Sequence, residues 1–450
     1  MAAAFASRGF NVIGVDVNPS SIEAVNSGRA PVQETGLDEM ISANKDRIRA
    51  TASHEEAVLG SDISFVIVPT PSDERGAFSL QYAAWAFKEI GKALAKKDGY
   101  HNVVLTSTVL PGGTREALLP ILERESGKKA GRDFGLCYSP EFIALGSIIK
   151  NFLNPDFTLI GELDDRCGSD LEALYSNVVE NGAPSARMSL ENAELAKISV
   201  NAFVTTKITF ANMLAEICEK LPGGDIDVVS NALGLDTRIG RKYLTGGLGY
   251  GGPCFPRDNF ALNFLAGQLG VDAGLSEKTD SMNRSVESKV VERLRPMIKE
   301  NSTVAVLGLS YKPFSHVTEE SQALYIAEAL SKAGARVVAY DPMSSEMSLG
   351  ETSSRMVILD SAKECIGQAD IVLVATPDPD FLNLSAEDFK NHLAKVTVVD
   401  FWRHLQNELE GKDWIDYVAF GRGRDDSGNA KRLRDLWVSH ESDSLTSAAK

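Results

Sequence analysis

The sequence has 450 residues with 43% hydrophobic and 24% charged side chains, which is typical of a soluble protein of two or three domains. Its formal net charge of −16 argues against a nucleic-acid surface or an anionic membrane as the partner. A phosphate-bearing ligand is not excluded, since glycine loops and helix N-termini bind phosphate without a net positive charge.

The first residues predict a short helix that stops at Gly9, followed by a buried strand over residues 11–16 that ends in Asp16. In a dinucleotide-binding unit, an acid at this place binds the ribose hydroxyls of adenosine. A carboxylate would repel a 2′-phosphate, so Asp16 favours NAD over NADP. A first strand and a G-x-G-x-x-G turn should precede this helix, and neither is present. We therefore expect the sequence to begin inside a dinucleotide-binding unit.

Two further strands of this domain, predicted over residues 63–68 and 103–106, run directly into segments that carry hydroxyl groups. Ligands of open α/β sheets lie at the carboxyl ends of the strands. The residues expected at the cofactor crevice are therefore Val68, Thr70, Pro71, Ser107 and Thr108. Thr114 is expected to cap the helix that follows.

From Leu190 the pattern becomes helical, through residue 221 and again over residues 281–299. A second α/β unit follows, with strands predicted over residues 303–309, 335–341, 371–376 and 396–400. The two units repeat the order strand, helix, strand ending in Asp, strand ending in Thr-Pro. We predict an α/β fold with two Rossmann-like doubly wound domains facing each other across a cleft and joined by a helical connector.

The predicted domains are a cofactor domain over residues 1–189, a helical central domain over 190–300 and a second Rossmann-like domain over 301–425. The charged, Ser-rich residues 426–450 are expected to lack regular structure. The long helices of the central domain are expected to pair in a homodimer or a higher homo-oligomer.

The five cysteines are scattered without a C-x-x-C pair, so neither a disulfide framework nor a metal site is predicted. No apolar run reaches the roughly 18 residues of a membrane span, and no secretory leader is visible. We expect a cytoplasmic protein with no membrane partner.

Cys254 lies in the glycine-rich segment 246–258 (GGLGYGGPCFPRD), four residues before Asp258. Glycine lets backbone approach a ligand closely, and a thiol presented from such a loop can be a nucleophile. A tight loop with a buried structural cysteine is the alternative. Cys218, inside an apolar helical stretch, is expected to serve packing alone.

Lys197 and Asn201 are four residues apart and so share one helix face. A cation and an amide that point together into a cleft can stabilise an alkoxide. A solvated helix face is the alternative for this pair.

Four motifs, taken together, resemble the UDP-glucose/GDP-mannose dehydrogenase family, whose members oxidise a sugar CH2OH to a carboxylate with two NAD. They are STVLPG at 107–112, SPEF at 139–142, NAELAK at 192–197 with Asn201, and the Cys254 loop with Asp258. The resemblance implies catalytic roles for Cys254, Lys197, Asn201, Asp258, Glu141 and Thr108.

By the same resemblance, Arg238 reaches the sugar of a neighbouring subunit, and Lys312 contacts the substrate. The resemblance also assigns Phe142, Tyr243, Gly249, Tyr250, Gly251 and Tyr311 to substrate binding, together with Glu141, Lys197 and Asn201. Oxidation to an acid needs a thiolate to trap the aldehyde, so that water can cleave the resulting thioester.

Two positions depart from the family pattern. Leu145 stands where a second Glu is usual, and Glu319 stands where an Arg is usual, which marks either a subfamily or a weakened NAD site. Arg403 aligns with a substrate arginine of the family only after a shift of one residue.

Phe142 is typical of the family's hexose enzymes, so UDP-glucose is the expected substrate, with conversion to UDP-glucuronate. A UDP-N-acetylhexosamine 6-dehydrogenase is the alternative enzyme. A nucleotide-sugar-binding protein with an impaired NAD site is the alternative of another class, because a missing central strand would expose strand edges and reduce NAD affinity.

Overall fold

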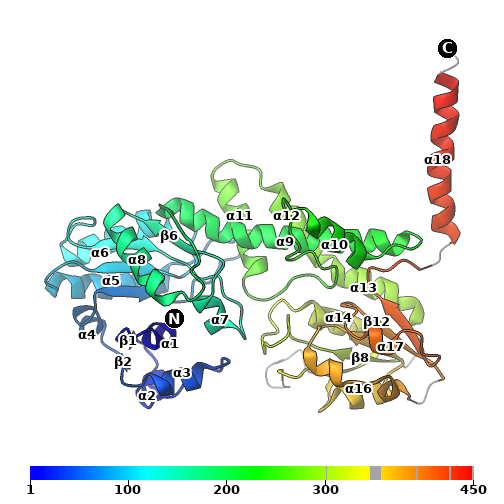
Figure 1. Cartoon of the computed structure of the whole chain (residues 1–450), viewed down its shortest axis with the longest axis horizontal. Helices are drawn as coiled ribbons and strands as arrows, with labels where there is room; N and C mark the ends of the chain where they lie inside the picture. Colours follow the sequence, from blue (N-terminus) through cyan, green and yellow to red (C-terminus); the bar gives the residue numbers. More distant parts are fainter. Residues whose placement is uncertain (300–301, 345–355, 392–393, 425–426, 448–450) are drawn as a thin grey trace. The chain divides into compact units, whose positions relative to one another are not determined.

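The computed structural model describes the chain except for residues 300–301, 345–355, 392–393, 425–426 and 448–450. The chain forms two compact units, the first from Met1–Val200 with Phe260–Asp272 and the second from Asn201–Asn259 with Ala273–Lys450. Helices α9 (Leu190–Lys220) and α11 (Phe255–Gln268) contribute residues to both (Figure 1).

The first unit is an α/β structure with two separate sheets. One pairs β1 (Val12–Val15) in parallel with β2 (Ile48–Thr51). The other has the order β3 (Ile63–Val66), β4 (Asn102–Leu105), β5 (Gly135–Tyr138), β6 (Thr158–Glu162) and β7 (Ser185–Ser189). Its pairs are parallel except for β5 with β6, which is antiparallel.

Successive side chains of β4 point to opposite faces of the larger sheet, and both faces are covered by helices. Val103 and Leu105 pack with α5 and α6, whereas Val104 faces α8 and Phe5 of α1. Phe5 packs against Phe65 of β3 with 5.1 Å between the ring centroids and the rings tilted by 43°. The helical elements of this unit are α1 (Ala2–Ser7), α2 (Pro19–Asn26), α3 (Leu37–Ala43), α4 (His54–Leu59), α5 (Gln81–Lys96), the π-helical η1 (Gly113–Leu118), α6 (Leu119–Ser126), α7 (Ile148–Leu153) and α8 (Asp165–Val178).

The second unit contains a parallel sheet of six strands. In spatial order these are β10 (Val357–Ile358), β9 (Arg336–Tyr340), β8 (Thr303–Leu307), β11 (Ile371–Val374), β12 (Val396–Asp400) and β13 (Ile415–Ala419). In chain order from β8 this is the 3-2-1-4-5-6 arrangement of a doubly wound Rossmann sheet. The predicted α/β class is therefore confirmed.

The two faces of this sheet are covered by different helices (Figure 1). Val304 and Val306 pack with α13 and α14, and Ala305 and Leu307 pack with α16. The helical elements of the unit are α10 (Ile226–Leu235), α12 (Gly274–Arg284), α13 (Val286–Leu294), η2 (Arg295–Met297), α14 (Gln322–Lys332), α16 (Ala362–Gln368), η4 (Pro379–Asn383), η5 (Ala386–Phe389), α17 (Gln406–Leu409) and α18 (Ser427–Ser447).

The two sheets of the first unit correspond to the two halves of the six-stranded sheet of the second unit, which lie on either side of its central strand β8. In the second unit, β8 pairs with β9 on one edge and with β11 on the other. In the first unit, no strand among the described residues lies between β1 and β3 in this way. β1 and β3 thus each keep one edge without a partner strand in the described part of the chain.

The end of the chain differs from its prediction. Residues 426–450 were expected to lack regular structure, yet Ser427–Ser447 form α18. The segment has no proline and contains Ala430, Lys431, Leu433 and Arg434, all of which favour helix. Its polar composition indicates solvent exposure, which is compatible with a helical backbone. Residues 426 and 448–450 lie outside the described part.

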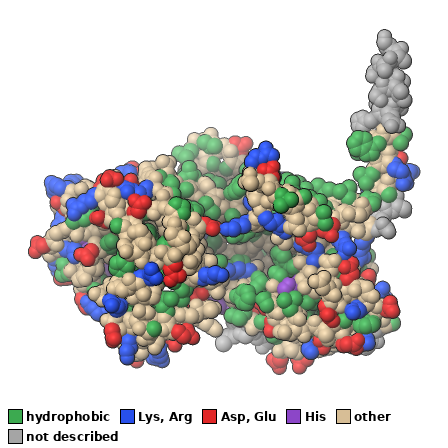
Figure 2. Space-filling view, viewed as in Figure 1, with side chains coloured by type: hydrophobic (Ala, Val, Ile, Leu, Met, Phe, Trp, Pro, Cys, Tyr) green, Lys and Arg blue, Asp and Glu red, His purple; other side chains and the backbone are tan. Residues whose placement is uncertain are grey.

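Acidic and basic side chains alternate over the face shown in Figure 2. The helices among the described residues are all too short or too polar to cross a membrane.

Candidate active site

The predicted cofactor residues come together at the carboxyl ends of β3 and β4, which are parallel neighbours. The Ser107 hydroxyl accepts from the Val68 amide and donates to the Val68 carbonyl, both at 2.7 Å. Thr70 Oγ1 donates to the Thr108 carbonyl at 2.8 Å. Pro71, on the exposed side, accepts from the Ser79 amide at 2.8 Å. These bonds hold the two strand-end segments side by side.

The two acids that end corresponding strands have different surroundings. Asp341, after β9, is buried and accepts four main-chain amides at 2.7–2.8 Å, those of Leu309, Ser310, Met343 and Ser344. Asp16, after β1, is exposed, and only its Oδ1 accepts a bond from the described residues, from the Asn18 amide. Asp16 can therefore bind ribose hydroxyls and Asp341 cannot, so the residues of the first unit fit the adenosine end of NAD.

The expected cap at Thr114 is wrong. The helical turn η1 begins after Gly112, and no side chain of its own segment caps it. The Glu194 carboxylate of α9 accepts from the Gly112 and Thr114 amides at 2.7 and 2.8 Å. A carboxylate satisfies two unpaired amides at once and favours the positive end of the helix dipole, which a single hydroxyl cannot match. Glu194 thus ties the Thr108 segment to α9.

Lys197, Glu141 and Phe142 form a cluster in the first unit. The buried Lys197 ammonium donates to the Glu141 carbonyl at 2.7 Å and lies 4.4 Å from the centre of the Phe142 ring. Glu141 Oε1 is buried and has no hydrogen-bond partner among the described residues. Burial raises the pKa of Glu141, against the opposing effects of the terminal amine and Lys197. A raised pKa suits a carboxylate that must exchange a proton near neutral pH.

Glu141 should therefore destabilise the fold while serving the reaction. Because its pKa is raised in the folded state, the folded chain binds this proton more tightly than the unfolded chain, and stability falls as pH rises above about 4.5. Glu141→Gln removes the charge at nearly constant shape. We expect a higher melting temperature than wild type near pH 8, a difference that shrinks toward pH 4, and reduced turnover.

Thermal unfolding monitored across this pH range measures the effect, and Glu23→Gln, at an exposed acid of α2, is the matched control. A stability difference independent of pH would show that the Glu141 carboxylate does not titrate as its burial requires.

Cys254 is the exposed cysteine of this chain, whereas the other four, Cys137, Cys167, Cys218 and Cys365, are buried. Cys218 packs in the main hydrophobic cluster of the second unit, as predicted. Cys254 directly precedes α11, and its carbonyl accepts from the Asp258 amide at 2.9 Å. The alternative of a buried structural cysteine is therefore wrong for Cys254.

Asn201 and Asp258 meet in the second unit. Asn201 Nδ2 donates to Asp258 Oδ2 at 2.6 Å, and the Arg257 guanidinium donates twice to Asp258 Oδ1, each at 3.1 Å. The Asp258 side chain is 1% exposed. Asn201 is four residues from Lys197 on α9, so this helix carries one residue of each cluster.

Tyr311 lies beside Cys254. Burial and then the negative charge of Cys254 raise the pKa of Tyr311 to about 12. Lys312 Nζ lies 5.6 Å from the Tyr311 ring centre. The predicted substrate residues of the second Rossmann-like domain thus adjoin the thiol loop.

Neighbouring protein atoms leave no room for a side chain at two glycines of the loop. A Cβ at Gly249 would lie 2.3 Å from Asn283 Oδ1, and one at Gly251 would lie 2.2 Å from the Glu320 carbonyl. Tyr250 is buried, and its hydroxyl donates to Asp280 and accepts from Asn259. The predicted residues Gly249, Tyr250 and Gly251 thus shape the loop from inside.

The remaining predicted residues lie apart from these clusters. Arg238 is exposed and forms an ion pair with Asp236 at 2.5 Å, and Tyr243 is exposed with a φ of 66°. Leu145 is at the surface. Glu319 supports the thiol loop through its backbone, because its carbonyl accepts from the Gly252 amide at 3.0 Å.

Sequence reasoning missed three residues that position the site. Glu194 lies inside the NAELAK motif, where its spacing before Lys197 was the available signal. Asn212 and Asn283 bind the backbone of the thiol loop, and nothing in their local sequence distinguishes them from ordinary helix residues.

Comparison with known proteins shows the family. Three models of the UDP-glucose/GDP-mannose dehydrogenase family match: the NAD-binding domain at residues 1–179, the central domain at 191–285 and the UDP-binding domain at 305–407. UDP-glucose 6-dehydrogenase AglM of Haloferax volcanii is 35% identical over 422 residues, covering 93% of this chain and 97% of that protein. The chain belongs to the UDP-glucose/GDP-mannose dehydrogenase family. It is an NAD-dependent nucleotide-sugar dehydrogenase with the NAD-binding domain of that family.

Two other family members are similar. The GDP-mannose 6-dehydrogenase of Pseudomonas putida is 38% identical over 347 residues, covering 76% of this chain and 77% of that protein. The structure of a UDP-glucose dehydrogenase from Pyrobaculum islandicum superposes with a TM-score of 0.83 at 32% identity, covering 94% of each chain. The nucleotide and the sugar thus differ among similar members of the family.

Proposed function

We propose that this dehydrogenase oxidises the C6 hydroxymethyl group of UDP-glucose to a carboxylate and so forms UDP-glucuronate. The observation that carries the proposal is the exposed Cys254 thiol, which precedes a helix whose first turn holds the buried Asp258 against Asn201. An oxidation that stopped at the aldehyde would not require a nucleophile. A thiol allows a second oxidation at the same carbon.

The residues of the chain take the following roles. Lys197 and Asn201 donate to the C6 oxygen, which becomes negative as its hydroxyl proton passes to solvent. Transfer of a hydride from C6 then gives the aldehyde. Cys254 Sγ adds to the aldehyde carbon, and loss of a second hydride leaves a thioester. Glu141, with Thr108, takes a proton from the water that cleaves the thioester and restores the thiol. NAD, when bound, supplies the hydride acceptor for both oxidations.

NAD is held, in this proposal, by Asp16 at the adenosine ribose and by the Val68 to Pro71 and Ser107 to Thr108 segments near the nicotinamide. The exposed Asp16 carboxylate and the cross-linked strand ends support these roles. The family's NAD-binding domain favours the catalytic interpretation over one of sugar binding alone.

The choice of UDP-glucose rests on one feature of the site. Phe142 follows Glu141, as in the family's hexose enzymes, and its ring is packed between Phe157, at 5.0 Å, and Lys197. Overall similarity does not separate the two nucleotides, since GDP-mannose 6-dehydrogenases of Azotobacter vinelandii and Pseudomonas aeruginosa match 92% of this chain at 33% and 34% identity.

A substrate panel tests the choice. We expect kcat/KM to be highest for UDP-glucose, at least about tenfold above UDP-N-acetylglucosamine, UDP-N-acetylmannosamine and GDP-mannose, because a misfit substituent or base leaves polar groups unpaired. NADH absorbance with each sugar nucleotide measures the rates. Faster turnover of an N-acetylated sugar or of GDP-mannose would replace UDP-glucose as the substrate.

Assembly as at least a homodimer is the second part of the proposal. Phe203, Phe210 and Ile217 recur every seven residues on α9 within the second unit, and all three are exposed. A stripe of large apolar side chains at this spacing is typical of a helix that packs against another. Arg238, also exposed, could then serve the site of a neighbouring subunit.

Phe210→Asp should convert the dimer to a monomer, since a charge would be buried in the pairing face. Sedimentation velocity of both proteins at micromolar concentration measures the change. Leu382→Asp, at an exposed apolar residue of η4, should remain dimeric. An active wild-type monomer would contradict the assembly and the role of Arg238.

A further inference from the structure

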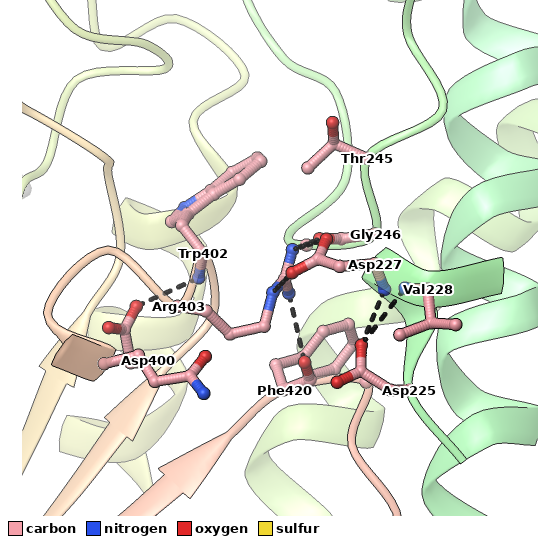
Figure 3. A network of polar contacts seen from close by, with 12 residues as sticks. Asp225, Asp227, Val228, Thr245, Gly246, Asp400, Trp402, Arg403 and Phe420 are labelled. Atoms are coloured by element: carbon pink, nitrogen blue, oxygen red, sulfur yellow. Dashed lines mark hydrogen bonds and ion pairs between the residues drawn. The ribbon is translucent and has the colours of Figure 1, made fainter. Parts of the chain in front are cut away.

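Arg403, three residues after the end of β12, has a buried side chain in the second unit, with its guanidinium fully bonded (Figure 3). Nε and Nη2 donate to the two carboxylate oxygens of Asp227 at 2.7 and 3.1 Å. Nη1 donates to the carbonyls of Phe401 and Phe420 at 3.1 and 3.0 Å, and Nη2 also donates to the carbonyl of Gly246 at 3.0 Å. A guanidinium has five N–H groups, so each has a protein acceptor.

These five bonds join three parts of the unit. Phe401 and Phe420 follow β12 and β13, Asp227 is in the first turn of α10, and Gly246 opens the loop that ends at Cys254. Asp225 fixes the start of α10 by accepting the amides of Asp227 and Val228. The backbone of Arg403 has a φ of 56°, which an L residue adopts at a cost and keeps only where its surroundings demand it.

Two asparagines continue the attachment along the loop. Asn212 of α9 accepts from the Gly247 amide at 2.9 Å and donates to the Leu248 carbonyl at 3.3 Å. Asn283 of α12 accepts from the Tyr250 amide at 2.8 Å and donates to the Tyr250 carbonyl at 2.9 Å. Both side chains are buried, and each pairs with backbone N–H and C=O groups of the loop as the edge of a neighbouring strand would. The loop backbone from Gly246 to Tyr250 is thus held at successive points.

We propose that Arg403, together with Asn212 and Asn283, positions the Cys254 loop, and that Arg403 does not bind the nucleotide sugar. The inference rests on the proposed role of Cys254 as the nucleophile. Its physical basis is that the donors of Arg403 are already used, while the loop it holds has glycines at five of its first seven positions, 246–252. Such a backbone has little stiffness of its own. Arg403, Asn212 and Asn283 are positioning residues.

Arg403→Lys is the main test, because lysine keeps the charge but cannot form the forked pair with Asp227 and reach three carbonyls at once. We expect kcat with UDP-glucose and NAD to fall about 10- to 100-fold, since small displacements of a reacting group cost this much. The dissociation constant of UDP, measured by calorimetry, should stay within about twofold. The rate of Cys254 alkylation by iodoacetamide, followed by peptide mass spectrometry, should change at least about threefold.

The controls separate the possible outcomes. Arg336→Lys, at an exposed arginine at the start of β9, should leave all three measurements unchanged. Asn283→Asp keeps the acceptor for the Tyr250 amide but loses the donor to its carbonyl, so it should reproduce the alkylation change without touching Arg403. If Arg403→Lys weakened UDP binding more than tenfold and left alkylation unchanged, Arg403 would be a ligand contact and the proposal would be wrong.

Alkylation also distinguishes this proposal from the proposed function. A changed alkylation rate in Arg403→Lys, with activity retained in Cys254→Ser, would keep the positioning role and remove the nucleophile. An unchanged alkylation rate and unchanged kcat in a folded Arg403→Lys protein would overturn the positioning role alone.

Discussion

Cys254→Ser is expected to abolish UDP-glucuronate formation, with a loss of at least about a thousandfold in the rate of acid production. A hydroxyl at this position is a much weaker nucleophile than a thiol, so the aldehyde would not be captured and the second oxidation would stop. UDP binding should be unaffected, because the substitution replaces a single atom, sulfur by oxygen, in an exposed side chain. Product analysis by liquid chromatography, with calorimetry for UDP, measures both effects.

Cys218→Ala is the matched control. The Cys218 thiol is buried in the main hydrophobic cluster of the second unit, so its loss should cost about 1 kcal/mol of stability and leave acid formation intact. Normal uronate production by Cys254→Ser would remove the covalent route from the account.

Lys197→Met should lower kcat by about 100- to 1,000-fold. The ammonium is buried between the Glu141 carbonyl and the Phe142 ring, and a buried cation stabilises a developing alkoxide far more than an exposed one. Methionine fills similar space without the charge. Because the Lys197 charge also holds down the raised pKa of Glu141, its loss should shift that pKa further upward. The pH at which activity rises should move in the same direction.

Steady-state kinetics across pH measures the Lys197→Met effect. Lys92→Met, at an exposed lysine that pairs with Glu89 on α5, should leave kcat and the pH profile unchanged. If Lys197→Met raised KM and left kcat unchanged, Lys197 would be a binding residue without a part in the chemical step.

Periodic patterns in the sequence were enough to predict both Rossmann-like units and the long α9. The predicted strands at residues 303–309, 335–341 and 371–376 appear, slightly shortened, as β8, β9 and β11, and the one at 396–400 appears with the same bounds as β12. The strands β2, β5, β10 and β13 were not predicted, and neither were β6 and β7. Their residues, Thr158–Glu162 and Ser185–Ser189, are half polar and do not form a continuous apolar run. α18 was not predicted, because a charged, Ser-rich composition does not distinguish an exposed helix from an irregular segment.

The site was predictable where a motif carries its own chemistry. Cys254, Asp258, Lys197 and Asn201 were proposed in this way, and the structure pairs Asn201 with Asp258. The positions of the Thr108 segment and of the thiol loop depend on Glu194, Asn212, Asn283 and Arg403. Their partners are backbone groups 33 to 157 residues away in sequence. No local sequence pattern predicts such bonds, because the side chain and the backbone group that it binds are far apart in sequence.

The two acids after β1 and β9 illustrate the same limit. From the sequence alone, either acid could bind a ribose, since each ends a strand of a Rossmann-like unit. Only the structure shows that Asp341 is consumed by four backbone amides while Asp16 remains available to a ribose. The difference accounts for why NAD is assigned to the first unit and not to the second.

The central claim is that one nucleotide sugar is oxidised twice at the same carbon. The most direct measurement is the amount of NADH formed from a limiting, known amount of UDP-glucose, with the product identified by mass spectrometry. The account predicts two molecules of NADH for each UDP-glucose and a product that is the carboxylate. A yield of one NADH with an aldehyde product, or binding of UDP-glucose with no NADH formed, would contradict it.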